Sequence, residues 1–391
     1  MLSILFVDDE PRILEGIQRM LRPMRGEWSM RFVASGPAAL EELARAPAEV
    51  VVSDMRMPGM SGADVLEQVR QRWPDAVRIV LSGQADEGLV ARVVHCAHQF
   101  LGKPCEPEAL KATIRRACAL RAMVADPALR RLAGGIDALP SVPALYHELM
   151  AIMADPAAAI ADAAAVVGRD PAMSAKLIQV VNSGFFGLRR KVTLTVDAAT
   201  LLGMDALRAL VLGEHAFKSM TGESTLADEL WRHSSAVAGA CRAIARAESA
   251  SKSIADQAFM AGMLHDVGQT LLETRVGTTY AALVHQTRAH DIRLDTAEQA
   301  LLKASHGPLG GYLLGLWGLA DDIVEAVAHH HEPSRAGSAV FGPLAIVHVA
   351  DALLDAGAGG RLDGAYLASI GVAARVPDWT SLVETGRAGS P

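Results

Sequence analysis

Short apolar runs that end in polar residues alternate with helical patterns over residues 1–120. Five of these runs are predicted as strands, at residues 3–7, 30–34, 50–54, 77–81 and 99–102. The β-branched run Val50-Val51-Val52 is typical of a strand buried on both faces of a parallel sheet. Because strands that alternate with helices form βαβ units, the pattern predicts an α/β domain with a five-stranded parallel sheet.

Helical spacing continues after the fifth strand. Glu106-Pro107 begins a helix that is expected to run to about Val124, and a second, short helix is expected to end at Gly134-Gly135. Beyond that point the strand patterns largely vanish, and Asp170-Pro171, for example, begins another helix. We predict four segments: an α/β domain at 1–120, a helical linker at 121–135, an all-helical domain at 136–355, and a C-terminal helical extension and tail at 356–391.

Composition narrows the classes of function. Hydrophobic residues make up 51% of the 391 residues, and the net charge of −7 is mixed along the chain. No basic run or aromatic-basic interleaving indicates nucleic-acid binding. The N-terminus is too short and too acidic for a signal peptide, and aspartates interrupt the alanine-rich stretch 150–167, so no membrane span is expected. Four cysteines without metal or disulfide spacing favour a reducing compartment, and we expect a cytoplasmic protein.

Polar residues stand at the ends of the predicted strands: Asp8, Asp9, Asp54, Ser82 and Lys103. In a doubly wound sheet these ends converge on one edge. Three nearby carboxylates repel one another unless a cation neutralises them, and oxygen ligands with an open position suit Mg²⁺. Lys103 and Mg²⁺ would balance an incoming phosphoryl group, and Asp54 would form an aspartyl-phosphate.

These residues, with the context D-x-x-M-P-G-M-S-G that begins at Asp54, resemble the response-regulator receiver domain. The resemblance implies a flavodoxin-like fold that a histidine kinase phosphorylates on Asp54. It also implies a set of roles: Mg²⁺ held by Asp8, Asp9, Asp54 and Arg56, phosphate contacts from Ser82 and Lys103, Phe100 as the aromatic switch, and a cis Lys103-Pro104 bond. Because the face of the fourth and fifth receiver helices often dimerises in the family, a homodimer is a further expectation.

A second group of polar residues lies in the apolar, helical surroundings of the second domain. Its members are His233, His265, Asp266, His306, His330, His331 and Asp351. Burying an unpaired carboxylate or imidazolium is costly, so these side chains are expected to have partners. The partner is either a metal bound by neutral imidazoles and carboxylates, or another member of the group through a hydrogen bond, and the sequence leaves both open.

The second domain resembles the HDOD domain, a relative of the HD and HD-GYP phosphohydrolases. The motifs that carry the resemblance are LPSVP (139–143), RDPAMSAKL (169–177), VNSGFFG (181–187), LLGMDALR (201–208), AGMLHDVG (261–268), WGLA (317–320) and AVAHHHEP (326–333). In the HD relatives the metal set is a histidine, a His-Asp pair and a distant aspartate, which His233, His265, Asp266 and Asp351 match in order. His306, His330 and His331 map onto the further ligands of the cyclic-di-GMP phosphodiesterases. Two departures are Gln269, where those enzymes carry lysine, and Pro333-Ser334-Arg335 in place of their Gly-Tyr-Pro turn.

Two functions follow from this combination. The first is a two-component response regulator that signals through a non-catalytic HDOD domain by contact with a protein, such as a cyclic-di-GMP enzyme or a kinase. The second is a phosphorylation-gated phosphodiesterase that uses iron, manganese or zinc to hydrolyse a cyclic dinucleotide or a nucleotide. Measurements of metal content and of substrate turnover distinguish these two functions.

Overall fold

The computed structural model describes residues 1–82, 96–135, 140–141, 148–149, 152, 155, 158–182, 191–204, 207, 218–219, 225–355 and 361–388. At a few positions inside elements, among them Ser82, Phe100 and Trp231, only the backbone is described. Most of the LPSVP and VNSGFFG motifs lies outside the described residues.

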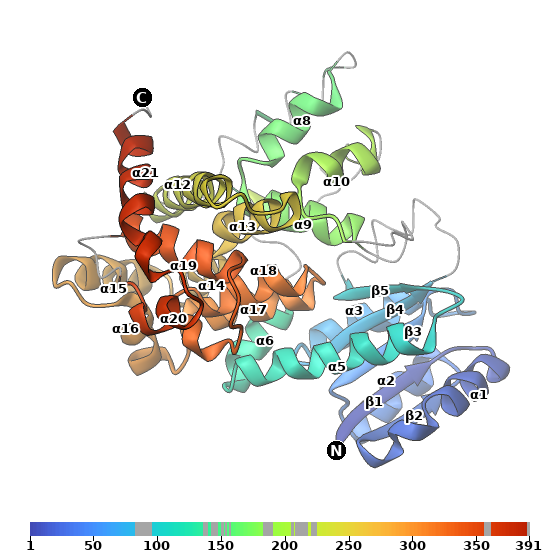
Figure 1. The fold of residues 1–391 in the computed structure, drawn as a ribbon. Helices are drawn as coiled ribbons and strands as arrows, with labels where there is room; N and C mark the ends of the chain where they lie inside the picture. The colour runs from blue at the N-terminus through green and yellow to red at the C-terminus, as the bar shows by residue number, and fades with distance from the viewer. Residues whose placement is uncertain are drawn as a thin grey trace.

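The first domain is built on a five-stranded parallel sheet of order β2-β1-β3-β4-β5. Its strands are β1 (Leu2–Val7), β2 (Trp28–Val33), β3 (Val50–Asp54), β4 (Val77–Ser82) and β5 (Gln99–Gly102). Helices α1 (Pro11–Met20), α2 (Gly36–Arg45) and α3 (Gly62–Arg72) connect them, with a short turn η1 (Arg22–Gly26) before β2. All five residues of β3 are buried. The predicted α/β fold and its parallel sheet are therefore confirmed (Figure 1).

A long helix, α5 (Pro107–Met123), crosses the sheet and leads to α6 (Pro127–Gly135) (Figure 1). Both glycines that were expected to follow the short helix belong to α6. The carbonyl oxygen of Gly134 accepts a hydrogen bond of 2.7 Å from the buried guanidinium of Arg78 in β4. Asp75, just before β4, forms ion pairs with Arg121 of α5 at 2.9 Å and with Arg130 of α6 at 3.1 Å. The helical connection is thus bonded to the receiver sheet at several points.

The second part of the chain is helical apart from two short paired strands among the described residues, β6 (Pro140–Ser141) and β7 (Lys218–Ser219). Its α-helices are α8 (Ile160–Val167), α9 (Pro171–Val181), α10 (Thr195–Leu202), α12 (Thr225–Ala247), α13 (Lys252–Leu264), α14 (Val267–Val276), α15 (Thr278–Ala289), α16 (Leu294–Leu302), α17 (His306–Leu316), α18 (Asp321–His329), α19 (Pro343–Leu354), α20 (Gly364–Ser369) and α21 (Val376–Ala388). Short turns of 3-10 helix are η3 (Pro333–Arg335) and η4 (Ala373–Arg375). The Asp170 side chain caps α9 by accepting from the Met173 amide at 3.0 Å, as the Asp-Pro signal predicts.

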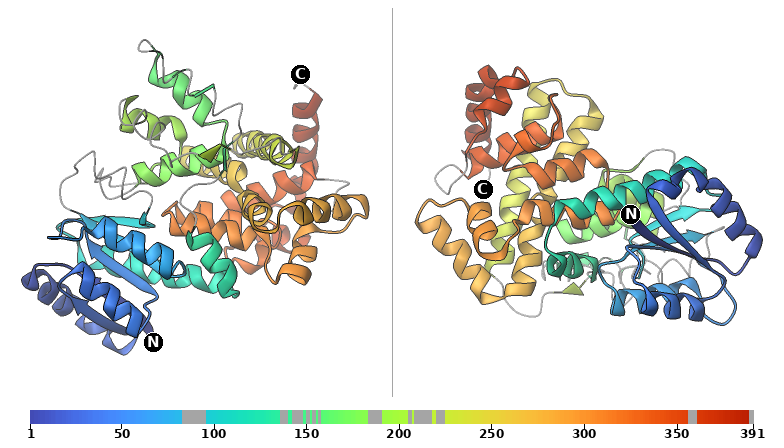
Figure 2. Two further views of the ribbon diagram at one scale, coloured as in Figure 1. Left: turned by 180° about the vertical axis from the view of Figure 1, so that it is seen from behind. Right: turned by 90° about the horizontal axis from the view of Figure 1, so that it is seen from below.

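The C-terminal helix α21 packs on α12 and α19 (Figure 2). Trp379 is fully buried there, and its indole nitrogen donates to Glu248 at the end of α12 at 2.9 Å. Arg375 pairs with the same carboxylate at 2.7 Å. None of the described helices is long and apolar enough to cross a membrane.

The two domains meet where α5 lies on α17, as both figures show. Leu120 of α5 packs so closely on Gly315 that a Cβ atom at that glycine would lie 2.2 Å from a Leu120 methyl carbon. Arg116 of α5 donates to the Leu319 carbonyl and pairs with Asp321 at 2.7 Å. The loop between α17 and α18 is therefore held by the last helix of the receiver.

Candidate metal centre and phosphoacceptor site

The pocket that was predicted from the sequence to accept a phosphoryl group lies at the carboxyl edge of the receiver sheet. Asp8 follows β1 and Asp54 ends β3, and only 1% and 7% of their surfaces are exposed. Lys103 follows β5, and its ammonium contacts the carboxylates of both Asp54 and Asp8, the latter at 2.8 Å. Burial by itself lowers the pKa of Lys103, but its hydrogen bonds to Asp54 and Asp8 outweigh burial and raise it. A charged lysine is thus held between the two carboxylates.

The other receiver residues singled out in the sequence surround this pocket. Asp9 follows Asp8 and is partly exposed. The Arg56 amide donates to Asp54 Oδ2 at 2.8 Å, which places the Arg56 backbone beside the Asp54 carboxylate. The side chains of Ser82 and Phe100 are outside the described part of the structure, although their strands are paired at the same edge. The Lys103-Pro104 bond is cis, as expected.

The metal-ligand candidates of the second domain converge from six helices or their ends. His233 comes from α12, and His265-Asp266 joins α13 to α14. His306 is the first residue of α17, His330-His331 follows α18, and Asp351 lies in α19. The sequence-predicted set is therefore one cluster, which we call the HD cluster.

One half of the HD cluster is formed by His233, His265, Asp266 and Asp351. The Nε2 atoms of His233 and His265 lie 3.2 Å apart. Asp351 Oδ1 lies 3.0 Å from the first of these nitrogens and 3.4 Å from the second. Asp266 Oδ2 lies 3.3 Å from His265 Nε2. Two imidazoles and two carboxylate oxygens are a donor set that suits a divalent transition metal.

The other half is formed by Asp266, His306, His330 and His331. His306 Nε2 lies 3.3 Å from Asp266 Oδ1, the oxygen that does not face His265. His331 Nε2 lies 3.0 Å from His306 Nε2. His331 Nδ1 also lies 3.6 Å from Asp351 Oδ2. Asp266 and Asp351 thus each present one oxygen to each half, the arrangement of carboxylates that bridge two ions.

Hydrogen bonds fix which ring nitrogen faces the cluster. His265 Nδ1 donates to the Gly262 carbonyl and His330 Nδ1 donates to the Val327 carbonyl, both at 2.8 Å. In the neutral rings the Nε2 lone pairs then point to the cluster, as in metal-binding histidines. His330 Nε2 is buried and has no hydrogen-bond partner among the described residues. Mutual hydrogen bonding therefore does not satisfy this atom, whereas a metal would.

No pattern in the sequence marks the supporting carboxylate of this cluster, Glu298 of α16. It is fully buried, and its Oε2 atom lies 2.7 Å from His306 Nδ1 and accepts from the His306 amide at 2.8 Å. Tyr280 of α15 donates to the other oxygen of Glu298. Carboxylates in this position fix the tautomer and orientation of a ligating histidine. The spacing of apolar residues could not have identified Glu298, because only its burial in the folded domain distinguishes it from other glutamates.

Burial and charge act in opposite directions on the cluster. Burial would lower the pKa of His265, but Asp266 and Asp351 raise it well above its usual value. Burial also opposes the change at His306, where Glu298 and Asp266 raise the pKa to about 9. At His331, burial and the neighbouring His306 lower the pKa to about 4. In the absence of metal these shifts would leave some imidazoles charged and others neutral, and a metal ion would have to displace protons to bind.

The opening above the cluster is small. It has a volume of about 40 Å³ and is lined by Asp266, Gln269, Arg293, Leu294, Asp295, His306, His331, Asp351, Asp355 and Arg361. Gln269 is neutral and its Oε1 atom is buried without a hydrogen-bond partner among the described residues. Arg293 is engaged by Asp295 in two hydrogen bonds of 2.9 and 2.5 Å.

Comparison with known proteins identifies both domains. The family model described as "Response regulator receiver domain" matches residues 4–115, and the model described as "HDOD domain" matches residues 139–333. The hydrogenase transcriptional regulatory protein HoxA of Cupriavidus necator is 37% identical over 126 residues, which are 32% of this chain and 26% of that protein. An uncharacterised protein of Treponema pallidum is 21% identical over 200 residues, 51% of this chain and 39% of that protein. The chain spans less than half the length of these curated relatives.

Solved structures show similarity to parts of the chain. The signal receiver domain of an HD domain-containing protein from Pseudomonas fluorescens is 28% identical, with a TM-score of 0.30, over 31% of this chain and 97% of that one. The MmoQ response regulator from Methylococcus capsulatus is 21% identical, with a TM-score of 0.46, over 63% of this chain and 98% of that one. Receiver domains generally bind Mg²⁺ and pair with histidine kinases. On the two family matches, the chain is a response regulator with an N-terminal receiver domain and a C-terminal HDOD domain.

Proposed function

We propose that this response regulator is phosphorylated on Asp54 and that its HDOD domain is a metal-dependent phosphohydrolase under the control of the receiver. The observation that supports a metal-dependent output is His330, whose buried Nε2 atom has no hydrogen-bond partner among the described residues. Four other potential ligands lie close to this residue, namely His265, Asp266, His306 and His331. Leaving such an atom unpaired costs about 1–3 kcal/mol. A metal ion would offset that cost.

Two metal ions are supported by the donor set. His233, His265 and Asp351 would hold one ion, His306, His330 and His331 the other, and Asp266 would serve both. Bound ions of this kind activate water and stabilise the charge on a phosphoester. Glu298 would orient His306 for this role, and Gly262 would orient His265. A cyclic dinucleotide or a nucleotide is the proposed class of substrate.

In the receiver, Asp54 would accept the phosphoryl group from a histidine kinase. Asp8, Asp9, Asp54 and the Arg56 backbone would hold Mg²⁺, and Lys103 already contacts the acceptor carboxylate. A phosphoryl group on Asp54 carries more negative charge than the carboxylate that it modifies, so Lys103 would move toward the phosphate. Ser82 and Phe100 are proposed to follow it, as in the family.

The signal would reach the HD cluster through α17 and α18. Each helix has one end at the receiver interface and the other at the cluster: α17 runs from His306 to Leu316, and α18 from Asp321 to His329. The eleven residues of α17 span about 15 Å. The receiver interface and the HD cluster are therefore connected by the length of a single rigid helix. A rotation of α5 against Gly315 and Asp321 would therefore shift the positions of His306 and His330.

A cavity supports the same route. Ala122 and Met123, at the end of α5, line a pocket of about 230 Å³ together with Ser305, Gly307, His330 and His331. The last turn of the receiver helix thus borders the reverse side of the ligand residues. Any shift of that turn changes the space next to His330.

A signalling adaptor is the second candidate, and the narrow opening above the cluster favours it. About 40 Å³ with a neutral Gln269 leaves little room or positive charge for a nucleotide. In that case the HDOD domain would act by contact with a protein partner such as a cyclic-di-GMP enzyme or a kinase, and the cluster would stabilise its fold.

Metal analysis of the full chain separates these functions. We expect close to two ions per chain after growth with iron, manganese or zinc, and loss of both in the His265→Ala, Asp266→Ala variant. The metallated protein should hydrolyse bis(4-nitrophenyl) phosphate, and the variant should not. Absence of metal in the wild type under all three growth conditions would rule out the hydrolase and leave the adaptor.

Phosphorylation is tested with acetyl phosphate and Mg²⁺. One phosphate should be incorporated in the wild type and none in Asp54→Asn, and hydrolysis should respond to acetyl phosphate only in the wild type. Asp291→Asn is the matched control, because Asp291 is exposed and has a positive φ of 53° that asparagine tolerates. Equal incorporation in Asp54→Asn would refute the acceptor assignment.

A further inference from the structure

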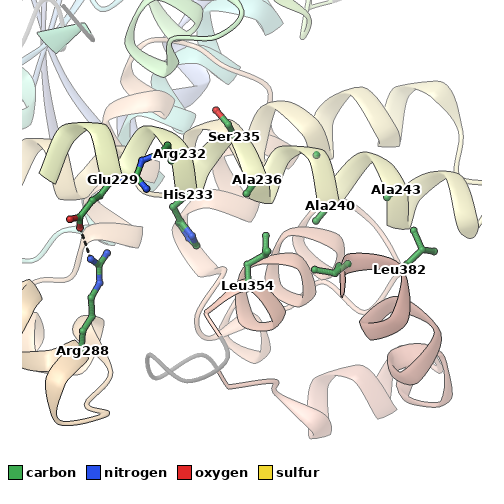
Figure 3. A pocket seen from close by; sticks show the side chains of 12 residues that line it. Glu229, Arg232, His233, Ser235, Ala236, Ala240, Ala243, Arg288, Leu354 and Leu382 are labelled. Carbon is green, nitrogen blue, oxygen red and sulfur yellow. Dashed lines mark hydrogen bonds and ion pairs between the residues drawn. The ribbon is translucent and has the colours of Figure 1, made fainter. Parts of the chain in front are cut away.

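A wide groove runs along α12 beside the HD cluster. It has a volume of about 830 Å³ and lies between α12, the end of α19 and the C-terminal helix α21 (Figure 3). Small residues of α12 form one side, namely Ala236, Gly239, Ala240 and Ala243. Leu354, Leu382 and Val383 line the other side, and Figure 3 shows Leu354 and Leu382 pointing toward α12. A concave space of this volume, lined by both apolar and polar side chains, is within the range of small-molecule sites.

One end of the groove is polar. Glu229 and Arg288 lie there and neutralise each other through an ion pair of 2.7 Å, drawn in Figure 3. Arg232 lies between Glu229 and His233 in the lining, is exposed, and forms no ion pair with any described residue. One positive charge is therefore left over at the polar end of the groove, which favours an anionic group on the occupant.

His233 connects the groove to the HD cluster. It lines the groove, and its Nε2 atom also lies 3.0 Å from Asp351 and 3.2 Å from His265. Its side chain is 19% exposed, whereas that of His265 is 0% exposed. An occupant of the groove thus lies against the accessible ligand of the first half of the cluster, on a wider approach than the 40 Å³ opening above Asp266.

We propose that this groove binds a phosphoester with an extended apolar body. The phosphate lies between Arg232 and His233, next to the first half of the HD cluster, and the apolar body lies over Gly239 and Ala240 against Leu382. The proposal rests on the metal centre of the proposed function, because a metal at His233 supplies part of the positive charge that holds the phosphate. It deepens that function by naming the class of ligand.

The test uses the full chain and three probes: n-octyl phosphate, inorganic phosphate and n-octanol, each titrated calorimetrically. Octyl phosphate is expected to bind at least tenfold more tightly than either of the other two, since only it fills both ends of the groove. The Gly239→Phe variant fills the apolar part, and a Cβ atom at Gly239 meets nothing within 4 Å. It should weaken octyl phosphate binding at least tenfold and leave metal content and inorganic phosphate binding unchanged.

Matched controls separate the groove from general effects. Gly16→Phe places the same side chain at a helical glycine of α1 that also has nothing within 4 Å, and should change nothing. Arg232→Gln should weaken both phosphate probes several-fold, whereas Arg246→Gln, on the same helix outside the groove, should not.

Unchanged octyl phosphate binding in Gly239→Phe would overturn the proposal, and so would equal affinity for octyl phosphate and inorganic phosphate. A change of oligomeric state in Gly239→Phe, by sedimentation, without loss of octyl phosphate binding would assign the groove to protein association and also overturn it. If the wild type contains no metal and Gly239→Phe still loses the probe, the proposed hydrolase fails while the groove assignment stands.

Discussion

The side-chain amide of Gln99 donates a hydrogen bond of 3.2 Å to the carbonyl oxygen of Gly315 across the boundary between the two domains. Gln99 begins β5, the strand that pairs with β4 up to Ser82 and leads to Lys103. Gly315 lies in the last turn of α17, which begins at His306. The edge strand that leads to Lys103 and a helix of the HD cluster are thus in direct contact.

Gly315→Ala should weaken this contact. A Cβ atom would lie 2.2 Å from the buried Leu120 side chain, so α5 must move or Leu120 must change rotamer. Overpacking of this kind costs about 1–3 kcal/mol. We expect a lower thermal unfolding midpoint, faster proteolysis between the domains, and a smaller response of the HD cluster to acetyl phosphate. The control is Gly16→Ala, where a Cβ atom meets nothing within 4 Å, and it should be neutral or stabilising by up to about 1 kcal/mol. An equal change of the thermal unfolding midpoint in both variants would contradict a role of the Gly315 contact in holding the two domains together.

Gly268→Ala should disturb mainly the half of the HD cluster that contains His306. A Cβ atom there would lie 2.0 Å from the carbonyl oxygen of His306, so α14 and α17 would be forced apart. His306 would then move away from His331, while His233 and His265 keep their positions. We expect the metal content, measured by elemental analysis, to fall from two ions toward one. Retention of both ions with unchanged affinity would show that His306 is not a ligand.

Glu298→Gln should lower metal affinity without removing a ligand. The carboxylate fixes the His306 ring, and loss of such a partner typically costs 10- to 100-fold in affinity. Tyr280→Phe removes only the hydroxyl that donates to Glu298, so its effect should be smaller. Chelator competition measures both. Equal affinities in the wild type and in Glu298→Gln would mean that His306 needs no such support.

His98 should make the receiver less stable in acid. Its Nδ1 atom accepts from the Arg78 amide at 3.1 Å and its Nε2 atom contacts the Gly134 carbonyl at 3.1 Å. Burial and the Arg78 charge lower its pKa well below the ordinary 6.5. Below pH 6.5 the unfolded chain binds a proton at His98 that the folded protein does not bind. The free energy of unfolding therefore decreases as the pH is lowered, by up to about 1.4 kcal/mol per pH unit from this group.

The comparison of wild type with His98→Asn isolates that contribution, because all other titrating groups are shared. The difference between their thermal unfolding midpoints should narrow or reverse as the pH is lowered from about 7.5 to about 5. Parallel curves over this range would show that His98 takes up its proton equally in both states.

Much of the receiver could be predicted from the sequence because its signals are local. The run Val50-Val51-Val52 ends at Asp54, and strand ends of a parallel sheet share an edge, so proximity to Asp8 and Lys103 follows from topology alone. The cis Lys103-Pro104 bond was also expected from the motif. Residue identity and strand order sufficed there.

The HD cluster could be predicted only as a set of candidates. His233 and Asp351 are 118 positions apart, and their 3.0 Å contact depends on how α12 packs on α19. The sequence left metal binding and mutual hydrogen bonding open. The packing of α18 decided that His330 Nε2 has no described hydrogen-bond partner, because Val327 takes the other ring nitrogen.

The sequence by itself therefore determined the fold classes of the two domains, the predicted phosphoacceptor residues and the identity of the metal-ligand candidates, because these depend on periodicity, strand ends and residue type. Only the tertiary structure decided that Glu298 supports His306, that Gln99 contacts Gly315, and that a groove beside His233 lies open between α12 and α21. Such contacts join residues far apart in the chain, and no local pattern encodes the relative placement of helices that brings them together.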